Sequence, residues 1–283
     1  TKDNGIANIL ILIGMTVLLL ILNRIVSRKA DGLEQMRKLI PFLVAGVSLF
    51  LYIISVIWIS YCHIQPTGDG MTLCHVAHRM SLDNFVDMKE KGYMYIFPHQ
   101  YGLLSVIRFI FAKFGIMNYQ VFQHINAACV PLLFYSGYKI IRLVYDKVGA
   151  ILSYMLLFLT CLPLFFYVPY VYGEVISITF TMVLMWQVIR YCKTGRRDSF
   201  VWGIMAIVIA CFVRNNSLIV LIAVGIVLCI HAIREAKIRG VLWLIVMILS
   251  VSFSQRIVDN YYEKESGLKI SGGVPYISWV RMG

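Results

Sequence analysis

Most of the residues that could do chemistry lie in one polar stretch, residues 65–102, of an otherwise apolar chain. Asp69 stands there between two glycines, in the sequence Pro-Thr-Gly-Asp-Gly, and glycine lets the backbone come close to a ligand. A carboxylate in this setting could act as a general base, or accept a hydrogen bond from an attacking hydroxyl group. It could also simply cap the helix that we expect to begin near Met71.

Two further charged residues stand at the ends of apolar runs. Glu174 follows Tyr172 and begins a run, where the helix dipole favours a carboxylate and where a membrane-border acid is also a functional candidate. Arg214 ends another apolar run and is followed by Asn215. Its guanidinium could hold a lipid phosphate in a bidentate contact, or reach the lipid headgroups without a specific role.

A Phe-Pro-His-Gln turn closes the polar stretch. Pro98 can start the helix that follows, and His99 could bind a phosphate or a sugar hydroxyl, or be a structural, hydrogen-bonded histidine. His75 and His78 lie one turn apart and give only a weak indication of a metal site, because no His-x-x-x-His or His–Cys spacing accompanies them.

Metal ions and disulfides remain open alternatives. The pattern demands no cofactor, although the carboxylates of Asp69 and Glu174 are suitable ligands for Mg²⁺ or Mn²⁺. The seven cysteines include no Cys-x-x-Cys pair, and most lie in apolar runs as small packing residues. Cys62 and Cys74 flank the start of the polar stretch and could form a disulfide if it faces an oxidising compartment.

Long apolar runs predict the elements that position these residues. The chain has 283 residues, of which 60% are hydrophobic and only 14% charged, and several runs exceed the roughly 18 residues that cross a bilayer. We therefore predict an all-α polytopic membrane protein. Its net charge of +12 fits Lys and Arg in cytoplasmic loops better than nucleic-acid binding. About eight transmembrane helices are expected, at residues 6–26, 39–61, 119–142, 147–167, 174–192, 199–213, 215–235 and 239–257.

Residues 101–116 decide the predicted topology. This segment is short for a span and carries Arg108 and Lys113, so it either crosses the membrane or lies in its interface. If it does not cross, 15 of the 26 basic residues gather on one side, in agreement with the positive-inside rule; if it crosses, ten of these move to the other side. We therefore expect a juxtamembrane helix here, a long outer loop at 62–118, and both termini outside.

Four motifs, in this order, resemble the GT-C membrane glycosyltransferases. They are Pro-x-x-Asp at 66–69, aromatic-Pro-His-Gln-x-Gly at 97–102, Pro-x-x-Tyr-x-Glu at 169–174 and Arg-Asn-Asn at 214–216. Within that superfamily the chain is most similar to the protein O-mannosyltransferases and lipid A aminoarabinose transferases of bacterial envelopes. The resemblance covers residues 39–283. It rests on the order and sidedness of the motifs, since none is strict individually.

The resemblance implies an inverting enzyme of the plasma (inner) membrane. Such an enzyme moves a sugar from a polyprenyl-phosphate carrier to a hydroxyl of a glycan, lipid or protein acceptor on the outer face. It implies Asp69 as the catalytic base and Glu174 as the acidic residue of the second outer loop. Candidate contacts to substrate, membrane lipid or lipid phosphate are Arg214, His99, Gln100, Arg108, Asn215 and Tyr172.

The resemblance also divides the chain. Residues 1–38 form an extra N-terminal helix and a basic cytoplasmic loop, residues 39–257 the GT-C-like module, and residues 258–283 the start of an outer region that continues further in relatives. Two other functions remain open. A flippase or transporter for a lipid-linked precursor would need polar residues deep within its spans, of which the chain has few. A non-catalytic scaffold would tolerate substitution of the outer carboxylates.

Overall fold

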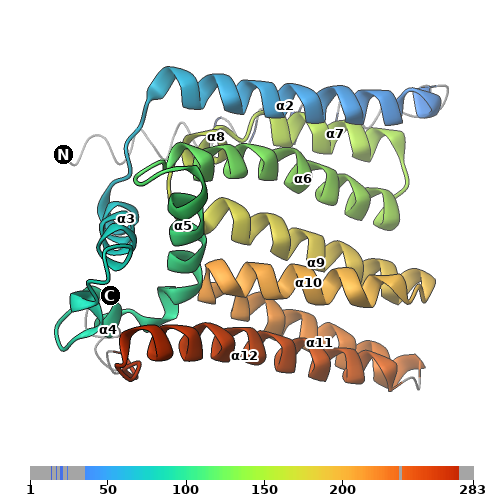
Figure 1. Cartoon of the computed structure of the whole chain (residues 1–283). Coiled ribbons are helices and arrows are strands. Elements are labelled where there is room, and N and C mark those ends of the chain that lie inside the picture. The colour runs from blue at the N-terminus through green and yellow to red at the C-terminus, as the bar shows by residue number, and fades with distance from the viewer. Residues whose placement is uncertain are drawn as a thin grey trace.

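Long helices running side by side form the body of the molecule, and shorter helices lie across one of its ends (Figure 1). The computed structural model describes residues 36–235 and 238–273, together with residues 14, 17, 20, 21 and 24. Within this part of the chain all regular structure is helical, as predicted. The elements are α2 (Ile40–Cys62), α3 (Gly68–Met80), η2 (Val86–Met88), α4 (Tyr93–Ile96), η3 (Pro98–Gln100), α5 (Tyr101–Phe114), α6 (Gln120–Val144), α7 (Val148–Leu159), α8 (Leu162–Tyr167), α9 (Glu174–Thr194), α10 (Asp198–Val213), η4 (Asn215–Ser217), α11 (Leu218–Glu235) and α12 (Arg239–Ser266).

Five of the described helices are long and apolar enough to cross a membrane: α2, α6, α9, α11 together with the short η4, and α12. This indicates a multi-pass membrane protein. The sequence predicted eight spans. The first of them, at 6–26, lies outside the described residues except for isolated positions. Two others form helices that are shorter than a full span.

The two shorter predicted spans have identifiable boundaries. The run at 147–167 is divided into α7 and α8, because Pro163 cannot donate a backbone hydrogen bond and its ring would clash with the carbonyl of Leu159 in a continuous helix. The run at 199–213 forms α10, which has only 16 residues. Both runs are apolar, but neither reaches the length of the five long helices.

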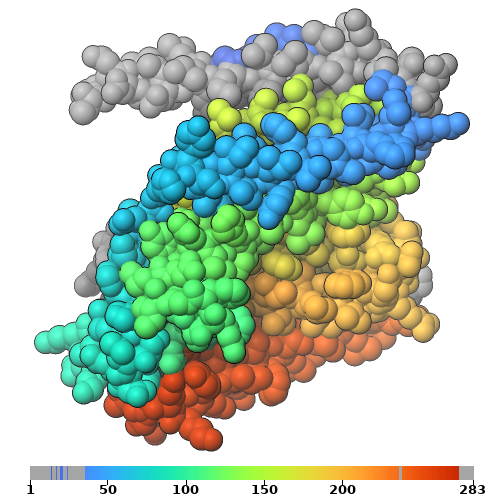
Figure 2. Space-filling view, turned by 45° about the horizontal axis from the view of Figure 1, so that its top comes forward, coloured from blue at the N-terminus to red at the C-terminus, as the bar shows by residue number. Residues whose placement is uncertain are grey.

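The surfaces of the outermost helices are those of a membrane protein. On α2, Phe42 is 76% exposed and Leu49 is 60% exposed, and on α12, Phe253 is 67% exposed. Figure 2 shows α2 along the outside of the bundle. Large apolar side chains exposed in such numbers on adjacent turns indicate contact with lipid, since water-soluble monomers rarely expose patches of this extent.

Helix α9 is the centre of the bundle. It packs against α6 on one side and α10 on the other, while α2 packs on α6, and α12 packs on both α10 and α11. Of the five long helices, α9 is the most enclosed by protein. Because α9 begins at Glu174, the residue predicted for the site is attached directly to this central helix.

The chain passes back and forth between the two ends of the bundle (Figure 1). Residues 63–119, the 160–173 connection, the 214–217 corner and the last turns of α12 lie at one end, which we call the loop end. The connections at 36–39, 145–147 and 195–197 lie at the opposite end, which we call the basic end.

Helix α5 lies crosswise to the long helices at the loop end (Figure 1). It buries one face through Leu103, Leu104, Ile107 and Phe111, a spacing typical of an amphipathic helix. Gly115, whose φ of +104° suits glycine, ends it. The segment 101–116 is therefore helical, as expected, and it contacts α3, α10 and α12 rather than running alongside the long helices.

Candidate functional site

Two buried amides of α6 hold the irregular backbone of the loop end. Asn126 is fully buried, and its Nδ2 donates to the carbonyls of Val168 at 3.0 Å and Tyr170 at 2.8 Å. One turn earlier, Gln123 donates from Nε2 to the carbonyls of Ile64 at 2.9 Å and Pro169 at 2.7 Å. These bonds satisfy carbonyls that no helix or sheet would satisfy, and so fix the turn that carries Tyr172 and Glu174.

Three glycines allow the segments of the site to approach one another. A Cβ on Gly70 would lie 2.5 Å from the carbonyl oxygen of Val171, and one on Gly173 would lie 2.6 Å from that of Val213. A Cβ on Gly102 would overlap the carbonyl oxygen of Phe212. Each glycine belongs to a different motif of the sequence. The three close contacts therefore join the 65–102 stretch, the 167–174 turn and the end of α10 into one site.

Tyr172 is the central side chain of this site. Its hydroxyl donates to Oδ2 of Asp69 at 3.2 Å and accepts a hydrogen bond from Nε2 of Gln100 at 3.3 Å. The guanidinium of Arg214 lies over its ring, 4.2 Å from the centroid, in a cation–π contact. Burial raises the pKa of the Tyr172 hydroxyl, so this group stays protonated and remains a donor near neutral pH. We call these four residues, with Glu174, the Tyr172 network.

A second tyrosine supports the same network. The hydroxyl of Tyr93 donates to Oε1 of Gln100 at 3.1 Å, which fixes the orientation of the amide that serves Tyr172. Burial is the main reason that the pKa of Tyr93 is raised, and the charge of Asp69 contributes to the rise. Gln100 is buried, and both ends of its amide are satisfied by tyrosine hydroxyls.

Glu174 holds Arg214 in place. Its Oε1 lies 2.8 Å from Nη2 of Arg214, and both side chains are a little more than a quarter exposed. Arg214 directly follows α10 in an extended conformation, which turns its side chain toward the start of α9. The structure thus brings together Asp69, Tyr172, Glu174 and Arg214, with the Asp69 carboxylate at the tyrosine hydroxyl and the guanidinium over the tyrosine ring.

His99 lies at the edge of this network. Partial burial lowers the pKa of its imidazole, and the positive charge of Arg214 lowers it further, while Asp69 acts in the opposite direction. The imidazole is therefore neutral at pH 7, with one nitrogen that donates and one that accepts. His99 also lines a small pocket with Asn215, whose Oδ1 accepts a hydrogen bond from Nε2 of Gln255 on α12 at 3.0 Å.

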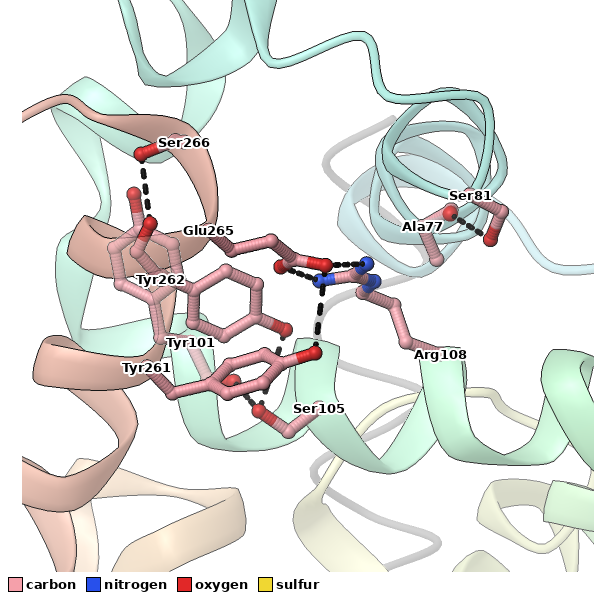
Figure 3. Close-up of polar contacts among 9 residues, drawn as sticks. All are labelled: Ala77, Ser81, Tyr101, Ser105, Arg108, Tyr261, Tyr262, Glu265 and Ser266. Carbon is pink, nitrogen blue, oxygen red and sulfur yellow. Dashed lines mark hydrogen bonds and ion pairs between the residues drawn. The ribbon is translucent and has the colours of Figure 1, made fainter.

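Arg108 is the one predicted contact residue that the structure places elsewhere. It lies two turns along α5, where Nη1 and Nη2 contact the two carboxylate oxygens of Glu265 at 2.6 and 2.8 Å (Figure 3). Its guanidinium also lies 5.3 Å from the centroid of the Tyr262 ring. The hydrogen bonds to Glu265 are the main reason that the pKa of Arg108 is raised, so its guanidinium stays positively charged.

Arg108 lines a groove between α5, α10 and α12, together with Tyr261 and Tyr262. The groove has a volume of about 820 Å³ and is lined mostly by apolar side chains. It shares two lining residues, Phe212 and Val258, with the small pocket beside His99. The apolar groove and the small pocket, whose lining is both polar and apolar, are therefore adjacent at these two residues.

The donor set does not favour a metal site. The described residues include no group of three or more His, Cys, Asp or Glu side chains that could hold a metal ion, and this applies to His75 and His78 as well. Asp69 is engaged by Tyr172, and Glu174 by Arg214.

The structure contains no disulfide between the two cysteines that flank the start of the 65–102 stretch. Cys62 and Cys74 are both free thiols. Cys74 is fully buried in α3, and this burial raises the pKa of its thiol to about 12. A thiol of such high pKa is unreactive near neutral pH.

Sequence reasoning missed several residues of the site. Tyr93 lies in the 65–102 stretch and Gln123 in a predicted span, but neither was among the predicted site residues, although a glutamine inside an apolar helix is a usable signal. Gln255 and Asp259 stand one turn apart near the end of α12, and only the fold shows that this turn reaches the pocket beside His99. Comparisons with protein-family models, curated proteins and solved structures gave no match to this chain.

Proposed function

We propose that this protein is a membrane glycosyltransferase that moves a sugar from a polyprenyl-phosphate carrier to an acceptor hydroxyl. The observation that supports this most strongly is the Tyr172 network. It holds a solvent-exposed carboxylate, Asp69, and a guanidinium, Arg214, on opposite parts of one tyrosine side chain. A base for a hydroxyl and a cation for a phosphate are the two groups that such a transfer needs.

In the proposed reaction the acceptor oxygen attacks the anomeric carbon on the face opposite the phosphate. Asp69 takes the proton of the acceptor hydroxyl as the new carbon–oxygen bond forms. The bond from the anomeric carbon to the phosphate oxygen breaks, and both of its electrons leave with the polyprenyl phosphate. The sugar is thereby transferred with inversion of configuration.

Arg214 stabilises the charge that grows on the departing phosphate. A guanidinium has five N–H donors, which is more than the two oxygens of the Glu174 carboxylate need, so donors remain for phosphate oxygens. Glu174 thus acts in this proposal as a positioning residue for Arg214. Tyr172 positions Asp69 by donating a hydrogen bond to its carboxylate before the acceptor arrives. Gln100 in turn orients Tyr172 by donating a hydrogen bond to its hydroxyl.

The groove beside α5 supports a donor with a hydrocarbon chain. Its lining is mostly apolar, and its volume of about 820 Å³ lies within the range of ligand sites. It borders the polar pocket at Phe212 and Val258, so a chain in the groove would have its polar end next to His99. A soluble nucleotide-sugar donor has no hydrocarbon chain that could occupy such a groove.

We also propose that the loop end faces the outside of the plasma membrane, with eight spans and α5 in the outer interface. The short connections of the basic end carry Lys147, Arg196 and Arg197, and Lys193 lies in the adjoining last turn of α9; the positive-inside rule places these residues in the cytoplasm. At about 1.5 Å per residue, the 14 residues of α5 span only about 21 Å, less than the ~30 Å of a hydrocarbon core.

A transporter for a lipid-linked precursor is the main rival. It would need polar side chains that line a path through the spans. The buried amides of Gln123 and Asn126 instead bind loop carbonyls, and the hydroxyl of Thr179 donates to the carbonyls of Cys129 and Val175. The donors of these side chains are engaged within the protein, although Oδ1 of Asn126 is buried without a partner among the described residues, and this arrangement favours an enzyme.

An assay for the products distinguishes the candidates. The purified protein is placed in liposomes with a polyprenyl phosphate that carries a radiolabelled sugar, together with a membrane extract as the source of acceptor. We expect free polyprenyl phosphate to form in step with labelled acceptor. Movement of the intact donor across the bilayer would support the transporter, and neither event would support a scaffold.

A further inference from the structure

The small polar pocket beside His99 has a composition that the proposed roles of Asp69 and Arg214 do not explain. Its volume is about 220 Å³, which is roughly the liquid volume of seven water molecules and below the size of most drug-like sites. It therefore has room for a single small ring. Its polar lining residues are His99, Asn215, Gln255, Asp259 and Ser271.

Helix α12 supplies the most polar wall of the pocket. Gln255 and Asp259 are four residues apart, so both side chains point from the same face of the helix. Gln255 uses Nε2 to donate to Asn215, which leaves its Oε1 as an acceptor and Nδ2 of Asn215 as a donor. The Asp259 carboxylate makes no hydrogen bond or ion pair with the described part of the chain.

The segment that follows α12 closes the pocket. Ile270 and Ser271 belong to the lining, and the hydroxyl of Ser271 donates to the carbonyl of Tyr95. The backbone N–H of Ile270 donates to Oε1 of Glu263 at 2.9 Å. Residues 268–273 thereby reach from the end of α12 across to the start of the Phe-Pro-His-Gln turn.

The charges of the described residues disfavour a phosphate as the ligand of the pocket. Among the part of the chain that the structure describes, no Lys or Arg lines it, and the Asp259 carboxylate would repel an anion. Hydroxyl groups, in contrast, can donate to a carboxylate in a charge-assisted hydrogen bond, and to an amide oxygen. The neutral imidazole of His99 and the amide of Asn215 add further donors and acceptors at the opposite wall.

We propose that this pocket holds the sugar ring of the donor, and that Asp259 and Gln255 are specificity-determining residues that accept hydrogen bonds from its hydroxyl groups. This inference rests on the proposed transfer function. The carrier chain would then lie in the groove that meets the pocket at Phe212 and Val258. The phosphate would lie outside the pocket, on the Arg214 side of His99.

The test compares binding of two probes to the full protein. Short-chain polyprenyl phosphate is added either bare or carrying a hexose or pentose, and the rise in Tm is measured in detergent. The wild-type protein is expected to gain more stability from a sugar-bearing carrier than from the bare one. Asp259→Asn and Gln255→Leu should lose this sugar-dependent part and keep the rise caused by the bare carrier. Asn260→Ala, an exposed neighbour on α12, serves as the control and should behave as the wild type.

Kinetics separate this inference from the function on which it rests. In the transfer assay, Asp259→Asn should raise KM for the sugar-bearing donor at least tenfold and reduce the discrimination between sugars. If transfer occurs but both variants keep the wild-type KM and sugar preference, the pocket assignment is wrong and the proposed function stands. If the wild-type protein neither transfers sugar nor responds to either carrier, both are overturned.

Discussion

At the scale of single residues, the proposed site depends on one tyrosine. Tyr172 contacts Asp69 through its hydroxyl and Arg214 through its ring, so it sets the distance between the two groups that would act on the substrate. Catalytic groups must be held close to the productive geometry, because small displacements cost large factors in rate. The hydroxyl and the ring of this residue can be tested separately.

Substitution of Tyr172 by Phe should lower the transfer rate about two- to tenfold, the effect of one net hydrogen bond. The variant loses the bonds to Asp69 and Gln100 but keeps the ring beneath Arg214. Tyr172→Ala should cost considerably more, since Arg214 then loses its support. The rates are measured in the liposome assay, with Tyr170→Phe as an exposed control. Equal rates for Tyr172→Phe and Tyr172→Ala would show that the ring has no role.

His99 makes stability depend on pH in a predictable direction. Its pKa in the folded protein is lowered from about 6.5, so the unfolded chain binds a proton more readily than the folded one. Stability should therefore be highest above pH 6.5 and fall as the pH drops through the interval below that value. His99→Gln should flatten this part of the Tm–pH curve, measured between pH 7.5 and 5. A wild-type curve that rises toward pH 5 and loses this rise in His99→Gln would contradict the stated direction.

At the scale of elements, close contacts between the backbones of separate segments assemble the site. Gly70, Gly102 and Gly173 lie where the backbone of one segment touches that of another. Helix α5 is held against α10 at Gly102 and tied to α12 by the pair of Arg108 and Glu265. The crosswise helix is thereby held to α10 near its start and to α12 two turns later.

Substitution of Gly102 by Ala should destabilise the protein by about 1–3 kcal/mol, as other overpacked sites do. The added methyl group would overlap the carbonyl oxygen of Phe212, so α5 must move away from α10. The measurement is the midpoint of thermal unfolding in detergent. Gly46→Ala is the matched control, because its Cβ meets nothing within 4 Å and alanine favours helix. A Gly102→Ala variant as stable as this control would show that the two helices are not in close contact.

The elements were more predictable than their contacts. Helical periodicity and hydropathy gave four of the five long helices close to their observed ends, because these signals are local, but the fifth, predicted to end at 257, continues as α12 to Ser266. The division of the 147–167 run into α7 and α8 could have been read from Pro163. By contrast, the partner of Arg108 could not have been read from the sequence, since Glu265 lies 157 residues further along the chain.

At the scale of the whole molecule, the two ends of the bundle differ in the charged residues that they carry and in what those residues contact. The loop end carries the Tyr172 network, the pocket and the groove, whereas the basic end is joined by surface contacts such as that of Arg37 with Asp146 at 3.3 Å. The sequence predicted that the four motifs share one end, and the structure brings them together (Figure 1). It could not predict that the Gln255–Asp259 turn of α12 reaches the same site.

Sidedness can be measured by cysteine labelling in intact cells. Tyr145→Cys and Thr194→Cys place exposed thiols at the basic end, and Leu82→Cys places one at the loop end, in a background where exposed Cys161 is replaced by Ser. We expect a membrane-impermeant maleimide to label position 82 at once, and positions 145 and 194 only after the cells are opened. Labelling of 145 and 194 in intact cells would reverse the orientation.

The most direct test of the central claim is the transfer rate of Asp69→Asn. Asparagine keeps the size of the side chain and can still contact Tyr172, but it cannot take a proton from the acceptor. The rate should fall by about 10²–10⁴-fold, the usual contribution of a general base, while bare polyprenyl phosphate still raises the Tm. Asp83→Asn is the control, since Asp83 is an exposed acid of the same stretch whose φ of +56° asparagine adopts readily. An Asp69→Asn variant that transfers sugar at the rate of the wild type would contradict the account.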